Sequence, residues 1–234
     1  MNARPEPPTA TPFLRSMLAI IWKDLAVEWR SRELLSAMLV FALIVLFIFN
    51  FALELDPKSR AGVTSGVLWV TFTFAGTIGL NRSLAMEKDR GCLDGLLLAP
   101  VDRTAIYFGK MIANLIFMLA VAAIVLPVYA VLYNNFNLFD PGLLLVILLG
   151  SLGYVAVGTL LAAMTVQTRT RDILLPILLF PIIIPLVVAA VKASSGFLQA
   201  LDMGEIWPWL NLMIVFDVVF TAVAFMVFDF VVEE

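Results

Sequence analysis

The chain has 234 residues, of which 62% are hydrophobic and only 14% are charged, and its formal net charge is −3. Soluble domains carry about 45–50% apolar and about 25% charged residues, so this composition excludes a water-soluble catalytic domain. Histidine is absent and cysteine occurs once, at Cys92. The chain therefore lacks the commonest metal ligand and general base, and a disulfide within the chain is excluded.

The N-terminal segment predicts a tail followed by a helix at the membrane surface. Residues 1–12 are rich in proline and threonine and are expected to be disordered. In residues 13–33 apolar side chains recur at helical spacing, which predicts an amphipathic interfacial helix. Its apolar stripe consists of Leu14, Met17, Leu18, Ile21, Trp22, Leu25 and Trp29. Tryptophans on such a face suit the headgroup region of a bilayer.

The polar residues of this helix leave its role open. Lys23 and Arg30 are expected opposite the apolar stripe, and Glu28 is expected to pair with Arg32 one turn later. One interpretation is an ordinary interfacial anchor. The other is an elbow helix that supports a docking surface for a cytoplasmic partner.

Six stretches are apolar enough to cross a bilayer, since a spanning helix needs about 20 apolar residues. Five carry no charge: residues 34–53, 61–81, 111–139, 141–168 and 173–191. The sixth, roughly residues 209–232, contains Asp217 and Asp229. The pattern predicts an all-α integral membrane protein in which residues 34–234 form one domain of six transmembrane helices.

The distribution of basic residues predicts the orientation of these spans. Twelve of the 15 lysines and arginines lie before the first span, between the second and third, or between the fourth and fifth. Basic residues concentrate in cytoplasmic loops, so both termini and these two loops are expected in the cytoplasm.

The connection at residues 81–103 is the longest of the cytoplasmic loops. It begins with charged residues, passes Gly91, and becomes apolar at residues 96–98 before Pro100 ends the run. A short helix with charged and apolar faces is a surface that a rigid cytoplasmic partner can grip. A solvated loop with a chance leucine run is the alternative. A second cytoplasmic contact is predicted at Arg169, Arg171 and Asp172, with a positively charged membrane anchor as the alternative.

Three features inside the spans are candidate functional or packing elements. Pro176, Pro181 and Pro185 fall in the fifth span, where they predict either a flexible or broken helix or a static kink. Asp217 in the sixth span is a candidate functional carboxylate, with either Asn211 or a residue of a partner subunit as its partner. The alternative is a position near the outer interface, if the span begins later. The fourth span contains Gly150, Gly153 and Gly158, which predict close helix packing.

Three segments resemble CcmB-type proteins, the permease subunits of the haem-exporter ABC transporter of cytochrome c maturation. The first is EKDRGCLDGLLLAPVDRTAIYFGK, residues 87–110. Its matching positions are Glu87, Asp89, Gly91, Asp94, Gly95, Leu96, Leu97, Pro100 and Lys110. The proline-rich residues 173–190 and the N-terminal residues 21–39 also resemble this family.

The resemblance implies an ABC-2-like permease of a bacterial inner membrane, coupled to a separate ATPase. No GxxxxGK[ST] motif occurs in the chain, so ATP is expected on a CcmA-like partner and this subunit is expected to be non-catalytic. The implied coupling residues are Glu87, Asp89, Arg90, Gly91, Asp94, Gly95, Leu96, Leu97 and Pro100.

The resemblance also implies the cargo and the other partners. Haem is expected to be handled by the complex rather than bound by this chain, either as exported haem or as a haem-loaded chaperone released by ATP hydrolysis. CcmC-like and CcmD-like membrane subunits are implied, a homodimer is left open, and no nucleic acid is expected. The alternatives are another ABC-2-type exporter, a gradient-driven transporter and a membrane scaffold.

Overall fold

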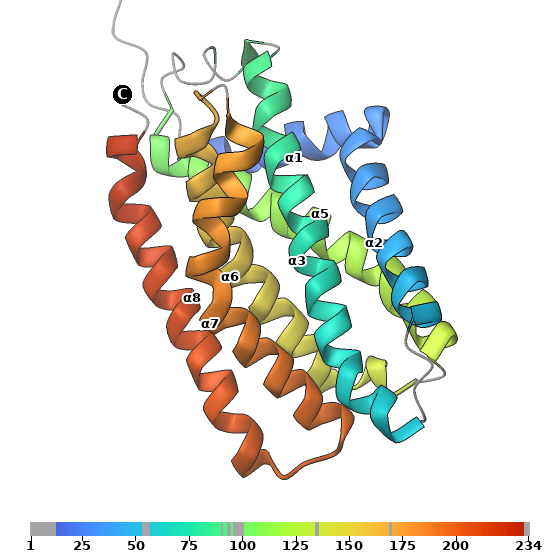
Figure 1. Cartoon of the computed structure of the whole chain (residues 1–234). Helices are drawn as coiled ribbons and strands as arrows, with labels where there is room; N and C mark the ends of the chain where they lie inside the picture. Colours follow the sequence, from blue (N-terminus) through green and yellow to red (C-terminus); the bar gives the residue numbers. More distant parts are fainter. Residues whose placement is uncertain are drawn as a thin grey trace, which may run out of the picture.

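The computed structural model describes residues 13–52, 57–89, 91–92, 95, 101–133, 136–168 and 170–231. Six long helices of this described part lie side by side in a bundle, and a shorter helix, α1, lies across one end (Figure 1). The long helices are α2 (Glu33–Ala52), α3 (Pro57–Asp89), α5 (Arg103–Tyr133), α6 (Pro141–Thr165), α7 (Arg171–Leu198) and α8 (Met203–Val231). The shorter helix α1 spans Phe13–Ser31, and a 3-10 turn, η1, spans Phe136–Phe139.

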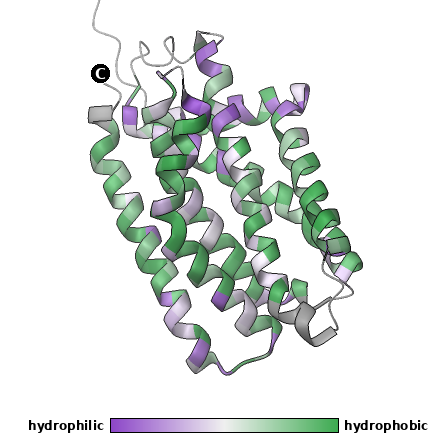
Figure 2. Cartoon of the chain, in the orientation of Figure 1, coloured by the Kyte–Doolittle hydropathy of each residue, from purple (hydrophilic) through white to green (hydrophobic). Residues whose placement is uncertain are grey.

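Each of the six long helices is long and apolar enough to cross a membrane. Hydrophilic residues gather at the two ends of the bundle, and hydrophobic residues fill the length between them (Figure 2). In α3 and α6, 72% of the most apolar window is buried inside the protein, against 22% in α2 and 28% in α8. The core therefore lies around α3 and α6, and the outer helices expose their apolar faces as lipid-facing helices do. The predicted all-α fold of six spans is confirmed.

A helix, α1, covers the segment predicted to be amphipathic, and it ends at Ser31 rather than residue 33. Arg32 then adopts a left-handed conformation with φ of 55°, and α2 begins at the next residue. The Glu28 carboxylate accepts hydrogen bonds from the backbone N–H groups of Leu34 (3.3 Å) and Leu35 (2.8 Å). It thus satisfies amide groups at the start of α2 that have no partner within the helix. The expected pair of Glu28 with Arg32 is wrong for this reason.

The face that α1 turns toward the bundle is its polar one. Its buried residues are Ser16, Ile20, Asp24 and Glu28, which follow one another at intervals of four. The apolar stripe points outward, with Trp22 74% and Trp29 81% exposed. This arrangement suits a helix at the membrane surface, where the outward face meets lipid. The polar face packs against the rest of the protein.

Helices α3 and α7 both differ from expectation. Helix α3 continues to Asp89, so residues 81–89 end a helix rather than begin a loop. Helix α7 runs without interruption from Arg171 to Leu198 and contains Pro176, Pro181 and Pro185, so the predicted broken helix is wrong. Pro181 and Pro185 are exposed on its outer surface, where the rings do not enter the core.

The glycines of α6 allow neighbouring helices to approach closely, as predicted. A Cβ atom on Gly150 would lie 2.1 Å from the ring of Trp69 on α3, and one on Gly158 would lie 2.2 Å from Leu80. The Trp69 indole N–H also donates to Ser194 Oγ on α7 over 2.9 Å, which fixes the ring between three helices. The Tyr154 hydroxyl of α6 donates to the Thr73 carbonyl of α3 over 2.7 Å.

We expect Gly150→Ala to lower stability by about 1–3 kcal/mol, because the added methyl group must displace a fully buried ring held by a hydrogen bond. The matched control is Gly66→Ala on α3, where an added Cβ would meet no atom within 4 Å. Thermal unfolding of the purified variants in detergent measures the difference. Equal melting temperatures for the two variants would show that Trp69 is not fixed against α6.

Candidate functional site

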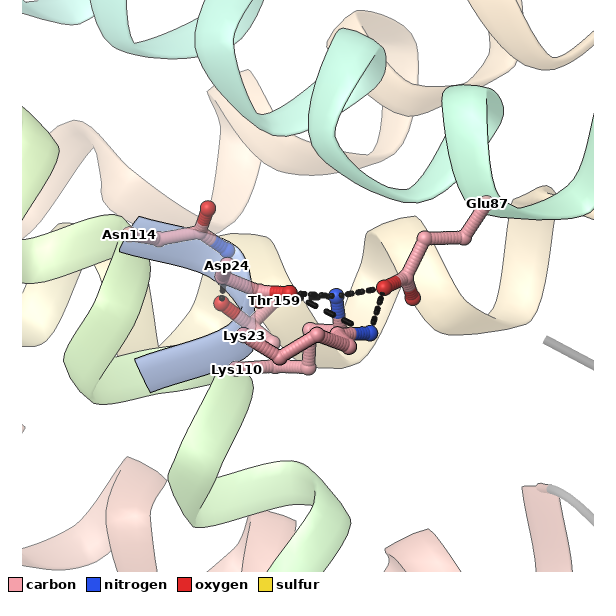
Figure 3. Close-up of polar contacts among 6 residues, drawn as sticks. All are labelled: Lys23, Asp24, Glu87, Lys110, Asn114 and Thr159. Atoms are coloured by element: carbon pink, nitrogen blue, oxygen red, sulfur yellow. Dashed lines mark hydrogen bonds and ion pairs between the residues drawn. The ribbon is translucent and has the colours of Figure 1, made fainter. Parts of the chain in front are cut away.

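A buried lysine forms the centre of a charge cluster that joins three helices (Figure 3). Lys110 lies about two turns after the start of α5, and its side chain is 3% exposed. Its Nζ atom lies 3.0 and 2.8 Å from the two carboxylate oxygens of Asp24 on α1. The same atom lies 2.7 Å from Oε1 of Glu87 on α3.

Lys23 of α1 completes the charge cluster, which we define as Lys23, Asp24, Glu87 and Lys110. Its Nζ atom donates to Oε1 of Glu87 and lies 3.3 Å from Asp24. Its side chain is 40% exposed, so it covers the rim of the cluster while Lys110 fills the interior. Lys23 was expected opposite the apolar stripe of α1, and it lies on that polar side, where two carboxylates draw its side chain inward.

The local sequence explains how α1 comes close enough to reach Lys110. Asp24 belongs to the buried stripe of α1, one turn after Ile20. Gly109, the residue before Lys110, faces Ile20, and a Cβ atom there would lie 2.9 Å from the Ile20 Cβ. The absence of a side chain at Gly109 therefore lets α1 pack directly on the backbone of α5.

The charges of the cluster balance, with two ammonium groups and two carboxylates. A buried charge without a partner costs several kcal/mol, so each member depends on the others. Burial lowers the pKa of Lys23, but Asp24 and Glu87 raise it by more, and the pKa lies above its ordinary value. Lys23 is thus positively charged at neutral pH. The four residues together form a charge-balanced cluster, in which Oε2 of Glu87 is buried without a hydrogen-bond partner among the described residues.

Hydrogen bonds on either side of Lys110 link α5 to α6. One turn after Lys110, the Asn114 side-chain N–H donates to Thr159 Oγ1 over 3.2 Å (Figure 3). Three residues before Lys110, the Tyr107 hydroxyl donates to the Ala156 carbonyl over 2.9 Å. Lys110 is therefore flanked on its own helix by two polar contacts to the buried helix α6.

The cluster lies at the two ends of the segment that connects α3 and α5. Glu87 precedes the last residue of α3 by two positions, and Lys110 follows the first residue of α5 by seven. The charge cluster therefore binds both ends of the connecting segment to each other and to α1.

An ion pair links the same end of α3 to α7. The Arg171 guanidinium donates to both oxygens of Asp89 over 2.8–3.1 Å. This pair brings together one residue from each of the two predicted cytoplasmic contacts. A similar pair joins Arg82 of α3 to Glu33 of α2 over 2.9 Å. Helix α3 is thereby linked at this end to α1, α2, α5 and α7.

The structure divides the predicted coupling residues into three groups. Glu87 lies in the charge cluster and Asp89 pairs with Arg171, so both serve contacts within the chain. Gly91 lies in a turn with φ of 67°, a left-handed conformation that glycine adopts readily, and both Cys92 and Gly95 are exposed. The remaining candidates lie outside the described residues: Arg90, Asp94, Leu96, Leu97, Pro100 and Arg169. Asp172 is described and exposed at the start of α7.

Asp217 lies inside α8, as predicted, and is 5% exposed. Neither carboxylate oxygen has a hydrogen-bond partner among the described residues, so the expected pairing with Asn211 is wrong. Asn211 is exposed on another face of the helix. Asp217 instead lies against α6, where a Cβ atom on Gly153 would be 2.1 Å from its Oδ1.

Asp24 is the member of the charge cluster that sequence reasoning missed, and Lys110 was noted without a role. The available signal was the spacing of four between Ile20, Asp24 and Glu28, which places two carboxylates on one face of α1. The second signal was a lysine standing about two turns inside an apolar helix. Neither pattern shows that Lys110 pairs with Asp24 and Glu87, because the three helices that carry these residues meet only in the folded bundle.

A sequence model of the CcmB protein family matches residues 15–233. The chain is 30% identical to "Heme exporter protein B" of Rhodobacter capsulatus over 72% of this chain and 78% of that protein. It is 24% identical to the protein of the same name from Pseudomonas aeruginosa, over 82% of this chain and 86% of the other. The corresponding protein of Paracoccus denitrificans is 27% identical over 76% of this chain and 81% of its own length.

Lys110→Met should lower stability by about 3–5 kcal/mol, because two buried carboxylates lose their central cation. Lys23→Met should have a smaller effect, since Lys23 is partly exposed and Lys110 remains in place. Lys192→Met is the control, because Lys192 is exposed on α7. Thermal unfolding of the three purified variants measures the order. The charge cluster is not a structural joint if Lys110→Met unfolds at the same temperature as Lys192→Met.

Proposed function

The chain belongs to the CcmB protein family, and from this we propose that it is the membrane subunit of an ABC transporter that exports haem for cytochrome c maturation. The observation that carries the proposal is the near-complete match to relatives named "Heme exporter protein B", which this chain covers over 78–86% of their length in the three cases above. The six membrane-spanning helices give the chain the architecture of a permease.

The energy for transport comes from a separate, CcmA-like ATPase subunit. The chain carries no GxxxxGK[ST] motif, which supports a nucleotide site on another polypeptide. This subunit then receives movement rather than producing it, and it has no catalytic residues of its own.

The segment at residues 90–102 is the element that receives this movement. Its two ends continue into α3 and α5, which the charge cluster holds together through Glu87 and Lys110. A force on the segment therefore acts on α3 and α5 as one unit, and the pair of Asp24 with Lys110 transmits this force to α1. We therefore favour the interpretation of α1 as an elbow helix that supports a docking surface for a cytoplasmic partner. The contact of Asp89 with Arg171 offers a parallel route to α7.

The end of the bundle that carries α1 faces the cytoplasm of a bacterial inner membrane, with both termini on that side. The distribution of lysine and arginine supports this orientation, because 12 of 15 lie toward that side. The ATPase then meets the 90–102 segment directly.

Haem is cargo of the complex rather than a resident group of this chain. Without histidine, an axial ligand from this chain would have to be Met, Cys or Tyr, and we assign iron ligation to other subunits of the CcmC-like and CcmD-like kind.

Deleting the gene in its host should abolish covalent haem in c-type cytochromes while b-type cytochromes keep their haem. The reason is that only the c-type proteins depend on the exported cargo. Haem staining of membrane and periplasmic fractions measures this, and expression of the parent chain should restore the signal. Normal c-type cytochromes in the deletion strain would favour another ABC-2-type exporter, a gradient-driven transporter or a scaffold.

Reversing two charges of the segment, with Arg90→Glu and Asp94→Lys, should lower retention of the ATPase subunit about tenfold or more. Placing like charges against each other costs several kcal/mol. Glu87 is left unchanged in this test, since its loss would break the charge cluster instead. Co-purification at equal membrane levels measures retention.

The control for this charge reversal is Lys192→Glu, at the opposite end of α7. It should retain the ATPase like the parent chain. Parental ATPase binding and cytochrome c maturation in the double variant would exclude the 90–102 segment as the coupling element.

A further inference from the structure

A large apolar groove runs along the outer surface of the bundle beside α1. Its volume is about 940 Å³, and it lies between α1, α2 and α5. One wall is formed by Leu35 and Leu39, one turn apart on α2, and the other by Ile116 and Ala120, one turn apart on α5. Because α1 lies at the membrane surface, the groove extends from the headgroup level into the hydrocarbon region.

The end of the groove nearest the junction of α1 and α2 is positively charged. Arg30 and Arg32, at the junction of α1 and α2, line this end and are exposed. The two nearby carboxylates are already engaged. Glu28 accepts hydrogen bonds from Leu34 and Leu35 at the start of α2, and Glu33 pairs with Arg82 over 2.9 Å. Glu28 keeps its negative charge, because its backbone N–H partners are neutral, but its carboxylate is held by the start of α2. The two guanidinium groups therefore leave this end of the groove with a net positive charge.

The aromatic residues at this end also match a lipid interface. Trp22 and Trp29 line the groove and are 74% and 81% exposed. Tryptophan rings in such positions lie at the level of lipid headgroups. A guanidinium pair above an apolar channel is complementary to a molecule with an anionic head and a long apolar tail.

We propose that this groove binds one anionic phospholipid, with its phosphate at Arg30 and Arg32 and an acyl chain between α2 and α5. A free phosphate ion would leave the apolar walls uncovered, whereas an acyl chain buries them. Glu28 and Phe117 line both this groove and the small cavity beside the charge cluster. Only these two side chains thus separate the lipid from the cavity beside the charge cluster. The bound lipid also holds α1 against α2.

The test compares phosphatidylglycerol with phosphatidylcholine on the purified full chain, by native mass spectrometry of lipid-bound states. The parent should retain one phosphatidylglycerol in preference to phosphatidylcholine. The variant Arg30→Gln with Arg32→Asn should bind phosphatidylglycerol about 25-fold more weakly, at about fivefold for each arginine near an anionic lipid. Asparagine is chosen at position 32 because it tolerates the left-handed backbone there.

Arg15→Gln is the matched control, because Arg15 is exposed on the same helix and does not line the groove. This variant should bind phosphatidylglycerol like the parent. A second variant, Ala120→Phe, fills the acyl channel without changing charge and should also lose the bound lipid. Thermal unfolding of each variant in detergent without added lipid confirms that it is folded.

Three results would overturn the proposal. They are equal retention of the two lipids by the parent, undiminished binding by the double arginine variant, and an equal loss in the Arg15→Gln control. Each would mean that the groove holds lipid without recognising its headgroup, or holds another membrane segment instead.

Discussion

Lys110 cannot be buried alone, and this requirement organises one end of the molecule. An ammonium group inside the protein needs anionic partners, and here they come from two different helices, through Asp24 of α1 and Glu87 of α3. Buried ion pairs add little net stability compared with apolar packing, but breaking them is costly. The arrangement therefore acts mainly by permitting one relative position of the three helices and penalising the others.

Close packing makes that arrangement reachable. Gly109 brings α1 onto α5, and the glycines of α6 bring α3 within contact of the bundle centre. The polar hydroxyls within the spans also bond to neighbouring helices, as Tyr154 does to Thr73. Close-packed protein interiors transmit displacement rather than absorb it, so we expect these helices to move as units. In the proposed function, force applied at residues 90–102 would therefore reach α1 and α5 together.

Much of the fold could be predicted from local signals. Uncharged runs of 19–29 residues predict five of the spans, since only a helix satisfies its own backbone in lipid. Helical spacing predicts α1, and the glycines of the fourth span predict its close contacts. Errors arose where charges were interpreted from sequence neighbours. Glu28 was assigned to Arg32, yet its carboxylate accepts hydrogen bonds at the start of α2. Lys23 was given no partner, yet it binds Glu87 of α3.

The sequence by itself determined the membrane class, the number of spans and the resemblance to a family, because each depends on composition or on residues close together in the chain. Only the tertiary structure decided which charged residues meet. Lys110 and Asp24 are 86 positions apart, and Arg171 and Asp89 are 82 apart. Sequence periodicity cannot predict a pairing across so many residues, because the pairing depends on how α1 crosses the end of the bundle and on where α3 ends. The pairing of charges is a property of helix packing, and the helix packing exists only in the folded protein.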